Sequence, residues 1–344
     1  MSLEFLRDVP LAARTTLGVG GPARRFVRVA DDGELRAALA DADRAGERVL
    51  VLGGGSNLVV GDAGWAGLVI QLADDRITLD ADGGVDAAAG ASWDELVARA
   101  VAAGLAGVEC LAGIPGLVGA TPMQNVGAYG QEVSDTITSV RVFDRERGEV
   151  GAMAGAACGF GYRSSIFRGS ARWIVLGVRF QLAPGARSSP IRYAELARAL
   201  AITEGDRAPL ADVRRTVIAL RRGKGMVVDP ADPDSHSAGS FFTNPILAPA
   251  ALAAALTLAG PDLPRWPQPD GTTKISAAWL IERAGFAKGT TRGRAGISRK
   301  HALALVNLGG ATATEILALA AAIVAGVHAR FGVTLEREPI LVSD

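Results

Sequence analysis

The stretch Arg48–Asn57 reads RVLVLGGGSN, an apolar run that ends directly in three glycines. A short continuous apolar run bounded by turn residues is typical of a buried strand. Upstream, the alternation in Arg25–Val29 predicts an earlier strand, and Asp31 or Asp32 can cap a helix that runs to about Ala45. A strand, a helix and a second strand in this order predict the start of an α/β layer.

The glycines themselves, Gly53, Gly54 and Gly55, predict a turn that can surround an anion. Without a Cβ atom, backbone N–H groups can approach an oxyanion closely. Ser56 and Asn57 add side-chain donors. The turn is not a Walker A motif, because no Gly-Lys-Ser/Thr follows it. Glycine-rich turns without ligands are common, so this run alone decides no function.

The remaining pattern predicts a mixed chain whose first half is richer in strands and whose second half, after about Ser188, is richer in helices. A capping box at Ser92 opens one helix, and a second capping box at Thr312 opens another. The predicted strands are Leu68–Leu72, Ile77–Leu79, Val85–Ala89, Ser139–Asp144, Trp173–Leu182 and Val333–Val342, and the predicted helices are Trp93–Ala103, Ala211–Arg222, Pro249–Ala259, Ser276–Ala284 and one from Thr312 to Gly332.

Composition excludes several classes of protein. A chain of 344 residues predicts two or three domains, and 49% hydrophobic residues indicate a folded globular protein. Lys plus Arg and Asp plus Glu both number 36, so no global positive field attracts nucleic acid or an anionic membrane. The longest apolar run, Ile316–Val327, is too short to span a bilayer, so we expect no membrane partner.

The cysteines and histidines predict no metal site. Cys110 and Cys158 form no CxxC pair, which fits a reducing cytoplasm, and the N-terminal residues lack the apolar core of a signal peptide. His236, His301 and His328 lack metal-ligand spacing, and no GxSxG nucleophile elbow occurs. We therefore expect structural roles for all five residues and a cytoplasmic location.

The segment Gly113–Gly130 is rich in glycine and weak in periodicity. It superficially resembles a Rossmann fingerprint but lacks the GxG opening and joins no clear strand to a helix, so we reject that interpretation. A long irregular segment inside a compact domain is usually functional. Gln124 and Asn125 offer amide groups of the kind that contact the edge of a flavin ring.

Five motifs occur in one order along the chain: GGGSN, IPGLVGATPMQNVGAYGQEV, GYRSSIF, AGSFFTNP and LEREP. In this order they resemble the UDP-N-acetylenolpyruvoylglucosamine reductases (the MurB family, type I branch), over Thr15 to Glu338. The resemblance implies an α+β chain with a two-lobed FAD-binding fold, like that of the vanillyl-alcohol oxidase (PCMH) group, and a smaller α/β substrate-binding domain. It places FAD lobe 1 at 1–65, completed by a C-terminal strand at 333–344, lobe 2 at 66–222, and the substrate domain at 223–332.

The resemblance also implies roles for individual residues. Arg163, Ser240 and Glu338 match the catalytic arginine, the proton-donating serine and the catalytic glutamate. The positions that match substrate contacts are Tyr129, Tyr162, Tyr193, Lys224, Asn244 and Lys274. The positions that match FAD contacts are Gly53, Gly54, Gly55, Ser56, Asn57, Leu58, Ile114, Pro115, Gly119, Ala120, Thr121, Pro122, Gln124, Asn125, Gly127 and Arg163.

The implied function is reduction of the enolpyruvyl group of UDP-N-acetylenolpyruvoylglucosamine in peptidoglycan synthesis, with FAD as cofactor, NADPH as reductant and a monomeric enzyme. Each matching residue, taken singly, is more often a surface charge or an ordinary structural residue, so the order of the motifs carries the hypothesis. The family often has Val-Arg after the glutamate, whereas Pro339-Ile340 follows Glu338 here. That difference puts one uridine-diphosphate contact in doubt.

Two alternatives remain open. A related flavin oxidase often attaches FAD covalently through a histidine, but no histidine precedes His236. A link through Cys110 or Cys158 stays open. A non-catalytic nucleotide-sugar-binding protein would not need Arg163, Ser240 and Glu338 together, so their joint presence favours the enzyme.

Overall fold

A computed structural model describes residues 3–343 of the chain. The chain divides into two compact units. The first comprises the described part of Met1–Val9 with Ala23–Gly54 and Ala66–Gly223, and the second comprises Pro10–Pro22, Gly55–Trp65 and the described part of Lys224–Asp344. The predicted segments 1–65 and 333–344 include residues 1, 2 and 344, which lie outside the described residues. The finer three-part division into 1–65, 66–222 and 223–332 stays a prediction.

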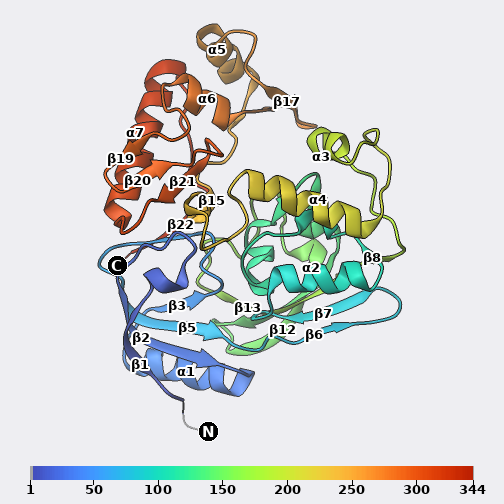
Figure 1. Cartoon of the computed structure of the whole chain (residues 1–344). Coiled ribbons are helices and arrows are strands. Elements are labelled where there is room, and N and C mark those ends of the chain that lie inside the picture. Colours follow the sequence, from blue (N-terminus) through green and yellow to red (C-terminus); the bar gives the residue numbers. More distant parts are fainter. Residues whose placement is uncertain (1–2, 344) are drawn as a thin grey trace. The chain divides into compact units, whose positions relative to one another are not determined.

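Among the residues that the structure describes, the first unit carries two larger sheets and four α-helices. Figure 1 labels these helices. Its strands are β1 (Leu6–Pro10), β2 (Pro22–Val29), β3 (Val49–Leu52), β5 (Trp65–Leu72), β6 (Ile77–Leu79), β7 (Gly84–Ala88), β8 (Leu105–Ala106), β9 (Gly127–Ala128), β10 (Gln131–Glu132), β11 (Ile137–Asp144), β12 (Glu149–Ala154), β13 (Trp173–Gln181) and β14 (Ala183–Pro184). Its helices are α1 (Asp32–Arg44), α2 (Trp93–Ala102), α3 (Ala194–Ala199) and α4 (Leu210–Gly223).

The predicted strand–helix–strand start is confirmed. Strands β1-β2-β5-β3 form one sheet, in which β3 and β5 run parallel, and α1 packs on it (Figure 1). Asp31 caps α1, because its carboxylate accepts the N–H of Glu34 at 2.9 Å. Leu35 on α1 and Leu68 on β5 are fully buried in the shared core. The glycine run therefore starts at the carboxyl end of a parallel strand.

The second sheet of this unit is antiparallel, in the order β12-β11-β13-β7-β6. Helices α2 and α4 lie with it in one hydrophobic core. Trp93, the first residue of α2, is buried, packs 5.9 Å from the ring of Phe180, and donates its indole N–H to Leu111 O at 3.0 Å. This bond anchors the beginning of the glycine-rich segment to the core.

The second unit is assembled mainly from the C-terminal part of the chain. Its strands are β4 (Leu58–Val60), β15 (Ser237–Ser240), β16 (Ile246–Leu247), β17 (Arg265–Pro267), β18 (Thr273–Ile275), β19 (Thr291–Arg292), β20 (Ala295–Ile297), β21 (Ala304–Asn307) and β22 (Ile340–Val342). Its helices are α5 (Pro249–Ala259), α6 (Ala277–Arg283) and α7 (Ala313–Phe331). The sheets are β15-β21-β20-β19, β16-β18-β17 and the parallel pair β22-β4.

Helix α7 organises the core of this unit. Thr312 and Glu315 form the predicted capping box, and Gly332 ends the helix at a φ of 68°. Asp62 accepts the N–H groups of Ala313 and Thr314, so the segment around β4 is tied to the start of α7. The prediction that this apolar run is too short to span a bilayer was wrong, since α7 has the length and composition of a membrane-crossing helix. Its buried residues belong to the core of the second unit.

The predicted terminal strand Val333–Val342 is correct only at its end. Strand β22 spans Ile340–Val342, and the preceding residues make an isolated bridge between Arg337 and Phe242. Pro339 has no N–H to give to a ladder, which limits strand pairing at this point.

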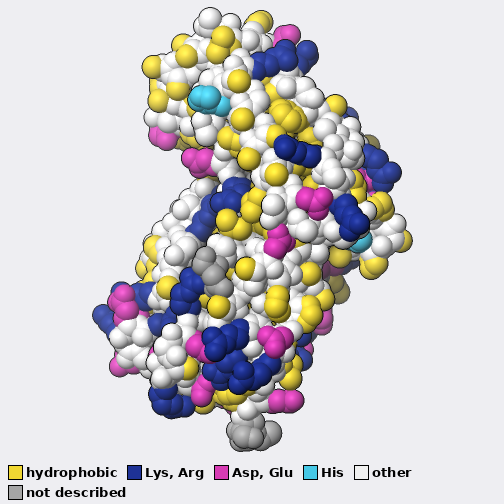
Figure 2. Space-filling model, turned by 90° about the vertical axis from the view of Figure 1, so that its left-hand side faces the viewer, with side chains coloured by type: hydrophobic (Ala, Val, Ile, Leu, Met, Phe, Trp, Pro, Cys, Tyr) yellow, Lys and Arg dark blue, Asp and Glu magenta, His cyan; other side chains and the backbone are white. Residues whose placement is uncertain are grey.

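On the face in Figure 2, acidic and basic side chains are interspersed with apolar ones, in agreement with the balanced charge.

Candidate FAD and substrate site

Two glycine-rich backbone segments meet within the first unit. A Cβ atom on Gly54 would lie 2.7 Å from Gly116 Cα, and one on Gly119 would lie 2.5 Å from Ala89 Cβ. Gly53 also faces Ala120, with 3.6 Å from its notional Cβ to that of Ala120. Real Cβ atoms do not tolerate the two shorter distances. The close approach of these backbones therefore requires glycine, which explains why both motifs are rich in it.

A residue that the sequence did not single out holds the second of these segments. The Asp94 carboxylate accepts the N–H of Gly113 at 2.7 Å and pairs with Arg214 on α4 at 3.1 Å. Asp94 stands in the first turn of α2, where an acidic residue is usual for its effect on the helix dipole. No spacing in the sequence connects it with Gly113, so only the folded chain reveals this role.

Part of the predicted cofactor segment already uses its own N–H groups. Gly119 donates to Ala89 O at 3.0 Å, Ala120 to Leu117 O at 3.0 Å, and Thr121 to Val118 O at 3.0 Å. The Thr121 hydroxyl also donates to Val118 O. Pro122 has no N–H. These residues can shape the wall of a cofactor site, while Ile114 and Pro115 stay half-buried at the other end of the segment.

Asn125 is a structural junction in this unit. It adopts the left-handed region, with a φ of 47°. Its amide donates to Glu132 at 2.7 Å and to Gly161 O at 3.2 Å, and its oxygen accepts the N–H of Ser134 at 3.1 Å. Because these bonds engage both ends of the amide, the predicted FAD contact of Asn125 is expected through its backbone rather than its side chain. Gln124 precedes it as the last residue of the short turn Pro122–Gln124.

Tyr162 and Arg163 form the tip of a tight turn. Gly161 and Ser164 exchange both backbone hydrogen bonds, at 3.1 and 3.2 Å. Arg163 has a φ of 52°, and its guanidinium donates to Gly127 O at 2.9 Å and lies 5.5 Å from the Tyr162 ring centroid. This hydrogen bond connects the turn to the segment around Gly127 and restricts the position of the Arg163 guanidinium.

Tyr129 and Tyr193 face each other in the same unit. Tyr129 and Gly130, with φ of 50° and 82°, connect β9 to β10 in the type I′ geometry of a two-residue hairpin. The two tyrosine rings meet edge to face with centroids 5.3 Å apart. Burial raises the pKa of Tyr129 to about 12, and burial also raises the pKa of Tyr193. Both hydroxyls therefore stay protonated and can donate hydrogen bonds at neutral pH.

In the second unit, Ser240 and Glu338 lie on paired backbone. Ser240 ends β15, opposite Ala304 on β21. The next residue, Phe241, donates to Leu303 O at 2.7 Å and accepts the N–H of Glu338 at 3.0 Å. The Phe241 side chain is fully buried, so it fixes this strand end in the core. The structure thus joins the backbone segments that carry the predicted serine and glutamate of this unit.

The second part of the GGGSN motif belongs to this unit as well. Gly55 is fixed because a Cβ atom would lie 2.0 Å from Arg14 O. Asn57 accepts the N–H of Ile340 at 3.0 Å, and Leu58 then begins β4, which pairs in parallel with β22. The bond places Ser56 and Asn57 beside the segment that carries Glu338.

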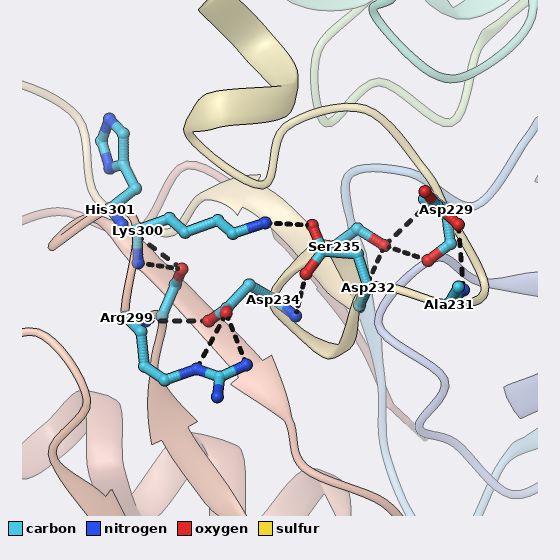
Figure 3. Close-up of polar contacts among 9 residues, drawn as sticks. Asp229, Ala231, Asp232, Asp234, Ser235, Arg299, Lys300 and His301 are labelled. Atoms are coloured by element: carbon cyan, nitrogen blue, oxygen red, sulfur yellow. Dashed lines mark hydrogen bonds and ion pairs between the residues drawn. The ribbon is translucent and has the colours of Figure 1, made fainter.

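The polar loop before β15 is held by ion pairs (Figure 3). The buried carboxylate of Asp234 accepts the backbone N–H of Arg299 at 2.8 Å and its guanidinium at 2.9–3.0 Å. Lys300 reaches Asp232 at 2.6 Å. A Cβ atom on Gly225 would lie 2.7 Å from Asp234 O, so the residue that follows Lys224 packs directly on this loop. The two ion pairs and the close packing of Gly225 therefore fix the backbone of this loop.

The other predicted substrate residues of this unit lie near α6. The side-chain oxygen of Asn244 accepts the N–H of Ala277, the first residue of α6, at 3.0 Å. Lys274 stands on β18, opposite Ile246 and Trp266 on the neighbouring strands. Arg163 belongs to the first unit, whereas Ser240 and Glu338 belong to the second. The roles of all these residues stay predictions.

The residues present fit a dinucleotide cofactor. The glycine cradle at Gly54 and Gly116 lets backbone approach backbone at a place that a Cβ atom would fill. Glycine-rich loops that pack in this way are the kind of backbone that can contact a bound pyrophosphate through N–H groups. Among the described residues, no group of three His, Cys, Asp or Glu side chains could hold a metal ion.

Comparisons with known proteins identify the two domains of the chain and its family. The family model of the FAD binding domain matches residues 23–154, and that of the UDP-N-acetylenolpyruvoylglucosamine reductase C-terminal domain matches residues 230–342. The reductase of that name from Thermobifida fusca (strain YX) is 54% identical over 352 residues, which cover 99% of both chains. That of Streptomyces avermitilis is 53% identical over 348 residues, covering 99% of this chain and 95% of the relative. A crystal structure of UDP-N-acetylenolpyruvylglucosamine reductase (MurB) from Thermus caldophilus superposes over 100% of both chains with a TM-score of 0.68 and 30% identity.

The fold and the cradle define an FAD-dependent oxidoreductase with a separate C-terminal domain. The predicted α+β fold with its FAD-binding part is thereby confirmed. The chain belongs to the UDP-N-acetylenolpyruvoylglucosamine reductase (MurB) family.

Proposed function

We propose that the chain uses NADPH to reduce the enolpyruvyl group of UDP-N-acetylenolpyruvoylglucosamine, and that Arg163, Ser240 and Glu338 carry the chemistry. The reduction itself, a step in peptidoglycan precursor synthesis, follows from family membership. Bound FAD supplies the hydride chemistry. Both cysteines are buried free thiols, which supports an enzyme of the reducing cytoplasm, and we infer that it acts as a monomer.

Arg163 is proposed to hold the carboxylate of the substrate. Reduction of the vinyl group builds negative charge toward that carboxylate, and a fixed guanidinium stabilises such charge. The bond from Arg163 to Gly127 O and the left-handed backbone at the turn supply this fixed position. The side chain therefore needs little reorganisation when the charge develops.

Ser240 is proposed to donate the proton to the substrate carbon, with Glu338 as its polar partner. The observation that carries this proposal is the hydrogen bond from Glu338 N to Phe241 O, which joins the two segments directly beside both side chains. A hydroxyl is a weak acid, so it acts only toward a carbanion-like centre and only when it is well oriented. Pairing of β15 with β21 fixes the backbone that carries Ser240, which supports this role.

The test separates the two half-reactions by stopped-flow absorbance of the flavin band. Reduction by NADPH requires no proton donor to substrate carbon, so Ser240→Ala and Glu338→Gln should leave its rate nearly intact. Reoxidation by the enolpyruvyl substrate should slow by about 10²–10⁴-fold, because a positioned proton donor typically contributes that much.

Matched controls are Ser139→Ala in β11 and Glu146→Gln, which pairs with Arg172 in the first unit. Neither control should change either half-reaction. Equal loss of both half-reactions in Ser240→Ala, with FAD still bound, would show that Ser240 shapes the flavin site instead of donating a proton.

A further inference from the structure

A carboxylate in the first unit has no role in the function proposed above and is completely buried. Glu109 lies at 0% exposure in the short turn Glu109–Leu111. One oxygen, Oε2, accepts the N–H of Gly107 at 2.6 Å. The other, Oε1, accepts the Gln131 side-chain amide at 3.0 Å and the Ser189 backbone N–H at 3.1 Å. All three donors are neutral N–H groups.

Burial of a carboxylate without a cationic partner is unfavourable by itself. The three donors offset that cost, because each would lack an acceptor without Glu109, and a further role for the residue follows from the segments that they join. The two donors that share Oε1 come from segments 58 residues apart by numbering, at 131 and 189.

Each of these two segments carries one member of the tyrosine pair. Gln131 directly follows the hairpin turn of Tyr129 and Gly130, and its side-chain oxygen also accepts the N–H of Cys110 at 2.9 Å. Ser189 leads into Tyr193, which precedes helix α3. One carboxylate oxygen thus joins the two chain segments whose rings meet edge to face at 5.3 Å.

Further contacts make this link stiff. The Ser188 N–H donates to Ala208 O at 2.8 Å, and the Ala208 N–H donates to the Ser188 hydroxyl oxygen at 3.1 Å. At the other end, a Cβ atom on Gly130 would lie 3.3 Å from Cβ of Arg192, the residue before Tyr193. Little slack remains between Glu109 and either ring.

We propose that Glu109 is a positioning residue that sets the Tyr129–Tyr193 pair for binding of the UDP-sugar. This inference rests on the proposed function, in which both tyrosines contact that substrate. Glu109 touches neither substrate nor cofactor. It acts through Gln131 and Ser189, and the property that it controls is the affinity for substrate rather than the rate of flavin reduction.

The test measures the dissociation constant of the enolpyruvyl substrate by titrating the flavin absorbance of the oxidised holoenzyme. Gln131→Met deletes the link on the Tyr129 side at nearly constant volume and should weaken binding about tenfold, as expected for loss of a hydrogen bond to a charged group. Glu109→Met deletes both links and should weaken binding further. Glu109→Gln can keep its oxygen toward Gln131 and Ser189, while its NH₂ group then faces the Gly107 N–H. It should therefore lower stability, but its dissociation constant for substrate should stay within about threefold of the wild type.

A merely structural role is distinguished by a double-mutant cycle with Tyr193→Phe. If Glu109 and Gln131 act through the tyrosine pair, in which the Tyr129 ring packs edge to face on Tyr193, Gln131→Met should weaken binding less than about threefold once the Tyr193 hydroxyl is gone. The rate of flavin reduction by NADPH should change less than about twofold in the Glu109 and Gln131 variants. Asp144→Asn, the same carboxylate-to-amide change at a buried site paired with Arg172, should lower stability and leave the dissociation constant unchanged.

A wild-type dissociation constant in Gln131→Met overturns the inference, and so does an equal loss with and without Tyr193→Phe. Because Gln131→Met removes a neutral side chain, it decides the question even where Glu109→Met does not fold. Failure of the proposed function looks different, since the wild-type reduced flavin would then not be reoxidised by the enolpyruvyl substrate at all.

Discussion

Replacement of Asp234 by Asn should destabilise the second unit by about 2–3 kcal/mol. The Asp234 side chain is 3% exposed, and its two oxygens receive one backbone N–H and two guanidinium N–H groups of Arg299 (Figure 3). An amide in either orientation turns an NH₂ group toward an N–H donor. A hydrogen bond to a charged group contributes about 1.5–3 kcal/mol, and loss of a partner in a fully buried pair costs about 3–5 kcal/mol. The Arg299 side chain is 68% exposed and can be rehydrated, which favours the lower range.

The matched control is Asp232→Asn in the same loop. In this variant the side-chain oxygen at position 232 can still accept the N–H of Asp234. Only the ion pair with Lys300, whose side chain is 36% exposed, is lost. Ion pairs of this kind contribute about 0–1 kcal/mol. Urea titration, with hydrogen exchange of residues 225–240 to locate the effect in the second unit, should therefore separate the two variants by at least about 1 kcal/mol. Equal losses in both would refute the reasoning from burial.

The same pair predicts a pH dependence. Burial alone would raise the pKa of Asp234. The hydrogen bonds from the backbone and guanidinium of Arg299 nevertheless hold this pKa below its usual value. A lowered carboxyl pKa stabilises the fold above the unfolded value of about 3.9, and this stabilisation is lost as the pH falls through the folded pKa. The stability gap between wild type and Asp234→Asn should be constant near neutrality and should shrink below about pH 4. A gap that grows on acidification would contradict the assignment.

Three further outcomes are expected. Tyr193→Phe should weaken substrate binding, measured by flavin titration, more than it slows flavin reduction, and an equal loss in both would count against contact of its hydroxyl with substrate. Acid denaturation should release all yellow colour into the supernatant because FAD is held non-covalently, whereas flavin in the protein pellet would revive a link through Cys110 or Cys158. Gly119→Ala should lower the FAD content and cost about 1–3 kcal/mol, because its Cβ would overlap Ala89; Gly151→Ala, which meets nothing within 4 Å, is the control. Unchanged FAD content in Gly119→Ala would argue against a cofactor site formed by the glycine-rich segment around Gly119.

The parts of the fold that the sequence predicted well are those encoded by local signals. The N-cap at Asp31 and the capping box at Thr312 begin their helices where predicted, because the capping group and the helix that it starts are adjacent in the chain. The apolar run before Gly53 forms β3 for the same reason. Periodicity and caps need no knowledge of the rest of the molecule.

The parts that failed depend on distant partners. The terminal segment alternates like a strand, yet Arg337 makes only an isolated bridge with Phe242, far away in sequence, and Pro339 interrupts the ladder. Likewise, the segment after Gly113 was expected to be irregular, whereas it contains the short turns Val118–Ala120 and Pro122–Gln124. Its shape comes from bonds such as Gly113 to Asp94, which local propensity cannot reveal.

The candidate site was found through its motifs, and the backbone now gives an independent argument for the same residues. Non-glycine residues in the left-handed region are uncommon, and each costs about 1–3 kcal/mol. Among the described residues five that are not glycine have positive φ, and three of them are Asn125, Tyr129 and Arg163. The motif match selected these three by chemistry and order, without any information on their conformation. Strain persists where the surrounding structure fixes it, as the bonds of Asn125 to Gly161 and of Arg163 to Gly127 do here. Strained backbone that coincides with chemically chosen residues favours a functional site over three separate accidents of folding.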